Sequence, residues 1–342
     1  KPGDKMSYYF EVWDNDGING SKSTRSDIRN FNMPSQRALE KEINNQSSEL
    51  KKDLSASMKQ AKDLKEKLKE AQDKMLEKKN LNWEDKKNLS ELADKQKELQ
   101  EQLKEIKNKL NETIKKQEDI KPVSEQLKQK QEKLQDLFNK VLDEEIKKLY
   151  EKLEKMLEEL NKKDAIEKMG EMEMSNEKLE KELDRMLELF KKLEFNKKLE
   201  ETADKLEQLA KKEEELAKQT EQQKENTTSD KAQDKNNKDG KADTNQQAQQ
   251  KKLQDEQKKL QEQLKEAKQD LNDLKKLNEE SKSGQDMKEA EQSMETADKQ
   301  MDEAQQQMEQ NQNQKAAQNQ KSAANNMKNA AQKMKDMKNK ME

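Results

Sequence analysis

The chain has 342 residues, of which 28% are hydrophobic, 3% aromatic and 43% charged. A compact domain of this size buries most of its chain, and so few apolar side chains cannot fill such an interior. Long thin helices need only two or three apolar residues in seven, so the composition indicates a mainly α protein. The 72 basic and 75 acidic residues are mixed along the chain, and the lack of a basic surplus argues against nucleic-acid binding.

Residues 1–34 differ from the rest of the chain. The run MSYYFEVW at positions 6–13 is dense in aromatic and β-branched residues, which predicts a strand, and a second strand follows at about 23–31. Tyr8, Phe10 and Val12 would lie on one face and Tyr9 and Trp13 on the other, so both faces would need covering by further strands. Because a lone two-stranded hairpin is only marginally stable, we expect the last hairpin of a β-sandwich whose other strands lie upstream.

The run DNDG at positions 14–17 lies between these two strands. It resembles the start of a calcium-binding loop, but an EF-hand needs a glutamate six residues after the glycine, where this chain has Ser23. Asparagine and glycine tolerate the backbone angles of tight turns, so we favour a hairpin turn over a calcium site.

Residues 35–218 predict an elongated antiparallel bundle of four helices, at about 35–79, 82–121, 122–163 and 176–218. Apolar residues recur every three or four positions in each, as in the second helix: Leu89, Leu92, Leu99, Leu103, Ile106, Leu110 and Ile120. Ser35, Asn82 and either Ser175 or Asn176 are candidate N-caps, and Pro122 suits the first turn of the third helix.

The rest of the chain divides into two segments. Residues 219–249 are almost entirely polar, which predicts a flexible linker or a fraying helix. Residues 250–342 predict a Met-, Ala- and Gln-rich helical segment: one helix to about Ser283, then two antiparallel helices. The phase of their Met and Ala seam changes across the polar stretch at 309–314. Heptads show that a helix has an apolar stripe for a partner helix, but they do not show whether that partner helix belongs to the same chain or to another copy. Pairing within one chain and homo-oligomerisation therefore both stay open.

The sequence contains no histidine and no cysteine, and its six glycines are scattered. This excludes histidine-based triads, thiolate sites and glycine-rich phosphate loops. Runs of carboxylates lie within charged helical stretches, where solvated faces explain them. We therefore expect no catalytic residues, no cofactor and no metal site.

Residues 176–195, NEKLEKELDRMLELFKKLEF, are the most distinctive helical stretch. Leucines at 187 and 189 lie off the main seam. One interpretation is a helix buried on two sides. The other is a docking surface for a second protein, which would consist of these residues: Arg185, Leu187, Leu189 and Phe195.

Residues 8–26, YYFEVWDNDGINGSKSTRS, together with residues 176–195, resemble a poorly characterised family of bacterial envelope proteins. Its members carry N-terminal transmembrane helices, an immunoglobulin-like region and a long helical tail rich in Gln, Lys and Met. The resemblance implies an envelope location and a membrane anchor in regions missing from this chain, which has no membrane-spanning segment and reads as a fragment. It implies no catalytic residues.

Three functions follow as hypotheses. The first is a non-enzymatic coiled-coil scaffold or spacer that contacts protein partners through its helical seams. The second is a regulatory interaction arm of a membrane-anchored assembly whose activity lies in other domains. The third is a chromosome-organising coiled coil, which the charge balance disfavours.

Overall fold

The computed structural model describes residues 3–15, 18, 20–78, 82–120, 122–149, 151, 152, 155, 162–233 and 241–341. The fold is mainly α with an N-terminal β-hairpin, as predicted. None of the helices within these ranges is both long enough and apolar enough to cross a membrane. The chain divides into two units, Lys1–Phe190 and Lys191–Glu342, and each has its own hydrophobic core.

This division corrects the predicted domain boundaries. The border between the units falls inside helix α5 (Lys162–Gln233), so residues 35–218 do not form one bundle. Helix also occupies most of the predicted linker at 219–249, because α5 continues to Gln233 and α6 (Lys241–Glu280) begins at Lys241. Residues 219–233 contain neither proline nor glycine, so nothing in them terminates a helix. Residues 234–240 lie outside the described part.

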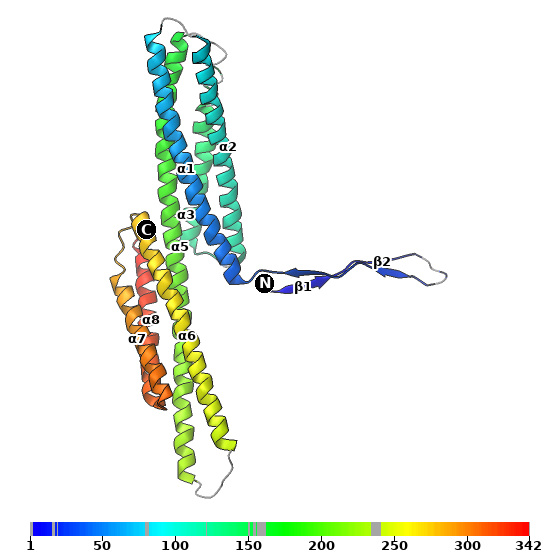
Figure 1. Cartoon of the computed structure of the whole chain (residues 1–342), viewed down its shortest axis with the longest axis vertical. Coiled ribbons are helices and arrows are strands. Elements are labelled where there is room, and N and C mark those ends of the chain that lie inside the picture. The colour runs from blue at the N-terminus through cyan, green and yellow to red at the C-terminus, as the bar shows by residue number, and fades with distance from the viewer. Residues whose placement is uncertain are drawn as a thin grey trace. The chain divides into compact units, whose positions relative to one another are not determined.

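The first unit begins with the predicted hairpin, drawn in Figure 1 as paired arrows. Strand β1 (Lys5–Tyr8) pairs with β4 (Arg29–Asn32), and β2 (Glu11–Trp13) pairs with β3 (Ser23–Arg25), both antiparallel. Between the two ladders, two residues of one arm oppose three of the other, which is a bulge. The hairpin is confirmed, whereas its origin in an immunoglobulin-like sandwich stays a prediction.

The helices of the first unit are α1 (Gln36–Glu77), α2 (Trp83–Ile120), α3 (Glu125–Lys140), the π-helical turn η1 (Val141–Ile146) and the first part of α5. Their apolar stripes share one core. Antiparallel pairing is marked by polar links between helices: Lys109–Asp53 and Lys116–Glu42 between α1 and α2, Gln135–Asn111 between α3 and α2, and Lys65–Glu180 between α1 and α5.

Two of the predicted helix caps are confirmed. The Ser35 hydroxyl accepts a hydrogen bond from the Ala38 N–H at the start of α1. At the start of α2, the Asp85 N–H donates to Asn82 Oδ1 and the Asn82 N–H donates to Asp85 Oδ2, both at 2.9 Å. This reciprocal pair is a capping box. Burial alone would raise the pKa of Asp85, but the Asn82 N–H and the Lys78 ammonium together lower it.

The other two predicted helix starts are wrong. Helix α3 begins at Glu125, so Pro122 precedes the helix and its Ser124 N-cap. Helix α5 runs through Ser175 and Asn176 without a break, and the Ser175 hydroxyl donates to the Glu171 carbonyl one turn earlier. Inside helices, serine and threonine hydroxyls commonly donate to a carbonyl one turn earlier. A residue type that favours N-caps is therefore no proof of a helix start.

The second unit combines the later part of α5 with α6, α7 (Lys288–Glu309) and α8 (Asn313–Asn339). The predicted antiparallel pair at the C-terminus is confirmed, and α7 and α8 lie side by side in Figure 1. Their seam is built from buried methionine and alanine, including Met294, Ala297, Met301, Ala323, Met327 and Ala330. The side chain of alanine ends at Cβ, so alanine at the seam lets the two helices approach closely.

A ladder of ion pairs joins α5 to α8 in the second unit. Lys321, Lys328 and Lys335 follow one another at intervals of seven along α8. Their partners Glu221, Glu214 and Glu207 follow at intervals of seven in the opposite direction along α5. The spacing is that of coiled-coil flanking positions, so these pairs fix an antiparallel register more than they add stability.

We predict that Ala323→Leu destabilises the second unit by about 1–3 kcal/mol, because a fully buried alanine at a close helix approach leaves no room for three more carbons. Denaturant unfolding followed by circular dichroism measures the change. Ala248→Leu, at an exposed position of α6, is the matched control and should change stability by less than about 0.5 kcal/mol. Equal effects of the two substitutions would contradict the packed seam.

Candidate interaction site

Exposed large apolar side chains are concentrated in the hairpin. In the part of the chain that the structure describes, all of them except Leu76, Trp83 and Met174 lie between Met6 and Met33. The helices of both units instead bury their apolar residues. Single exposed leucines are ordinary on protein surfaces, whereas a contiguous apolar patch is not. The hairpin is therefore the candidate interaction surface among the described residues.

The strand register assigns the exposed apolar residues to faces. Side chains alternate along a strand, and directly opposed residues share a face. Met6 lies opposite Phe31, Tyr8 opposite Arg29 and Val12 opposite Thr24, and Phe10 lies on the same face between the two ladders. The Tyr8 and Phe10 rings meet edge to face, with centroids 6.0 Å apart. Phe10 and Val12 are 68% and 69% exposed. We call these five residues, Met6, Tyr8, Phe10, Val12 and Phe31, the apolar face.

The opposite face of the hairpin combines bonded polar side chains with the exposed rings of Tyr9 and Trp13, which are 44% and 59% exposed. The Ser7 hydroxyl donates to Asn30 Oδ1 at 2.6 Å, and Arg25 Nε lies 2.9 Å from a Glu11 carboxylate oxygen. The Arg25 guanidinium also lies over the Tyr9 ring, 4.8 Å from its centre. The hydrogen bond from Arg25 lowers the pKa of Glu11. These contacts hold the arms together, and exposed aromatic rings remain on both faces, with the larger set of exposed apolar side chains on the face of Phe10 and Val12.

Asp14 takes part in the hairpin rather than in an ion site. Its Oδ1 accepts the Lys22 N–H at 2.9 Å, and its own N–H donates to the Lys22 carbonyl. Asp16 and Gly17, which completed the calcium-like pattern, lie outside the described residues. Across the described ranges, no cluster of three or more acidic side chains is placed to hold a metal ion.

The predicted docking surface does not exist in this structure. Leu187 is buried in the core of the first unit and Phe195 in the core of the second, and Leu189 packs against the first core. Arg185 is exposed, with its guanidinium 4.0 Å from Glu182. The leucines that lie off the main seam are explained by the first interpretation, a helix that is covered on more than one side. Their spacing alone cannot distinguish a second buried side from a bare one.

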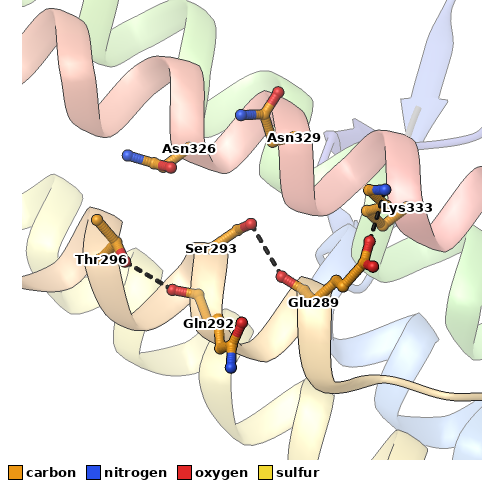
Figure 2. A pocket seen from close by; sticks show the side chains of 7 residues that line it. All are labelled: Glu289, Gln292, Ser293, Thr296, Asn326, Asn329 and Lys333. Carbon is orange, nitrogen blue, oxygen red and sulfur yellow. Dashed lines mark hydrogen bonds and ion pairs between the residues drawn. The ribbon is translucent and has the colours of Figure 1, made fainter.

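A shallow groove between α7 and α8, shown in Figure 2, is a second candidate binding surface among the described residues. Its lining is polar and comes from both helices: Glu289, Gln292, Ser293, Thr296, Asn326, Asn329 and Lys333. Glu289 and Lys333 pair across it at 2.6 Å. The Ser293 and Thr296 hydroxyls donate to carbonyls of their own helix. Much of the polar lining is thus already bonded, and an apolar anchor for a ligand is lacking among these residues.

Comparisons with protein-family models, with curated proteins and with solved structures yield no match. The functional interpretation therefore rests on the geometry of the chain itself.

We predict that Phe195→Ala lowers the free energy of unfolding by about 3–5 kcal/mol, because it empties the volume of a fully buried ring. Arg185→Ala removes an exposed side chain from the same helix and should change stability by less than about 0.5 kcal/mol. Denaturant titration of both variants makes the comparison. If Phe195→Ala changed the free energy of unfolding as little as Arg185→Ala does, the docking interpretation would be restored.

Proposed function

We propose that this chain is a non-enzymatic helical scaffold that binds another protein through the apolar face of its β-hairpin. One observation carries the proposal: the chain buries its helical stripes inside its two units but leaves Met6, Tyr8, Phe10, Val12 and Phe31 bare. Exposed aromatic and aliphatic side chains that gather on one side of an element are typical of protein interfaces.

The helical seams are a weaker candidate for partner binding than the hairpin. In the first unit, the stripe of α2 (Leu89, Leu99 and Leu103 among others) is covered within the same chain. The second unit covers its methionine and alanine seams in the same way. A partner helix would have to displace packed neighbours, whereas a partner at the hairpin would displace only water.

The chemistry of the hairpin favours a partner that offers an apolar β-sheet face. A sheet that leaves a set of apolar side chains exposed on one face is half of a two-layer sandwich, and it is completed when a second apolar layer covers that face. A lipid surface fits less well. Residues 1–34 carry five acidic and five basic side chains, so they lack the cationic surplus that draws amphipathic segments to anionic membranes.

We also propose that the scaffold works at the bacterial envelope. This location follows from the resemblance of residues 8–26 and 176–195 to an envelope family, and the balanced charge of the hairpin is compatible with it. A membrane anchor would belong to other parts of a longer protein.

Photo-crosslinking from single positions tests the proposed interface. A photoreactive residue at Val12, on the apolar face, should give a protein adduct in intact producing cells, because the partner covers this position. The same residue at Ser7, on the opposite face, should give little adduct. Trp83, a side chain 76% exposed on α2, is a second control for apolar surface outside the hairpin.

Competition separates a specific partner from adventitious capture. Excess unlabelled chain should suppress the Val12 adduct, and a Phe10→Ser, Val12→Ser double variant should not. Equal adducts from Val12 and Ser7, adducts to lipid only, or adducts only between copies of this chain would each overturn the proposed partner.

A further inference from the structure

A buried polar layer crosses the second unit, with side chains from several helices. Gln257 of α6 donates from Nε2 to Glu213 Oε1 of α5 at 2.9 Å. Gln320 of α8 donates from Nε2 to Gln257 Oε1 at 2.7 Å. All three side chains are fully buried. The Met308 sulfur of α7 lies 3.9 Å from Gln320 Nε2 and also 3.9 Å from the Thr220 hydroxyl of α5.

Two acceptor atoms of this layer have no hydrogen-bond donor in the described part of the chain. They are Glu213 Oε2 and Gln320 Oε1, and both are buried. An ionised carboxylate only accepts hydrogen bonds, and so does an amide oxygen. A proton on Glu213 Oε2 would turn one of these two acceptors into a donor. It would also remove a buried negative charge, which is the most expensive kind of group to hold in an interior.

We propose that Glu213 is a neutral carboxylic acid in the folded protein, and that loss of its proton loosens the packing of α5 against α6 and α8. The second unit thereby contains a pH-sensitive element at the level of Gln257 and Gln320. Buried polar groups fix which helices meet at one level of a bundle. In this layer, the packing of the helices depends on whether Glu213 carries its proton.

The electrostatic surroundings of Glu213 agree with this assignment. Burial raises its pKa from 4.5 to about 8, and the Gln257 amide opposes only part of this change. Neighbouring charged residues on each element lie at exposed or half-exposed positions among the described residues: Lys212 and Glu214 on α5, Glu256 and Lys258 on α6, Glu309 on α7, and Lys321 on α8. Lys258 pairs with Glu309, Lys321 with Glu221, and Lys328 with Glu214.

The direction of the pH effect follows from proton linkage. Between pH 4.5 and about 8 the folded chain holds a proton that the unfolded chain has released. Rising pH therefore lowers the equilibrium constant for folding of the second unit, by up to about tenfold per pH unit over this interval. The contribution of the Glu213 proton to the stability of the second unit is complete below pH 4.5 and lost above a pH of about 8.

The test compares the intact wild-type chain with Glu213→Gln, a neutral isostere whose amide donates a hydrogen bond at every pH. Hydrogen exchange of α6 and α8 peptides that contain Gln257 and Gln320, corrected for intrinsic exchange, should accelerate from mildly acidic to alkaline pH in the wild type. It should stay nearly constant in Glu213→Gln. Glu214→Gln, next to it but partly exposed and paired with Lys328, should retain the wild-type profile.

Infrared spectroscopy supplies a readout that does not depend on stability. A protonated-carboxyl band should be present at neutral pH in the wild type, absent in Glu213→Gln and unchanged in Glu214→Gln. Identical pH profiles for wild type and Glu213→Gln, or a missing carboxyl band, would overturn the proposal. Neither result would bear on the hairpin interface.

Discussion

The structure depends on the burial of narrow apolar stripes by neighbouring helices. With 28% hydrophobic residues, the chain cannot build a wide interior, so each helix offers a thin seam that must be matched by others. The chain supplies these matches itself, in two groups with separate cores. Hydrophobic burial holds each group together, while surface ion pairs such as Lys328–Glu214 mainly select the register.

Polar side chains in the second unit are structural rather than merely solvated. Gln250 and Gln254 of α6 both donate to the Met308 carbonyl near the end of α7, and Gln250 also bonds Asn313 at the start of α8. The Met308 carbonyl also accepts the Asn311 N–H in the turn that ends α7, so the two amides bind a carbonyl that this turn already engages and link α6 to it. The abundance of glutamine in this region therefore has a packing role, which the Glu213 layer extends into the interior.

Much of the fold could be predicted from the sequence, because periodicity and capping are local signals. The stripe of Leu89 to Leu110, the caps at Ser35 and Asn82, and the phase change between α7 and α8 are all present in the structure. The continuation of α5 through Ser175 and beyond residue 219 was not predictable in this way. Polar composition suggested a break at 219, but no proline or glycine stands between that residue and Gln233, and Gly170, inside the predicted break at 164–175, is accommodated within α5.

The interaction site was harder to predict than the fold. A heptad pattern shows that a side chain is covered, yet it does not show by what, so Leu187 and Phe195 could be read as either surface or core. The hairpin gave a better signal, since Tyr8, Phe10 and Val12 recur at every second position and lack enough neighbours nearby in sequence to cover them. The buried carboxyl of Glu213 had no distinguishing signal, because it lies in a run of three glutamates whose other members are not buried.

The central claim is that the apolar stripes are paired within one chain. Helical content by far-ultraviolet circular dichroism, measured through a wide dilution series with the mass checked by light scattering, tests it most directly. The account predicts high helicity that does not change with concentration, even where the protein is monomeric. Helicity that falls as the protein dissociates on dilution would show that the stripes belong to partner chains, and would contradict the account.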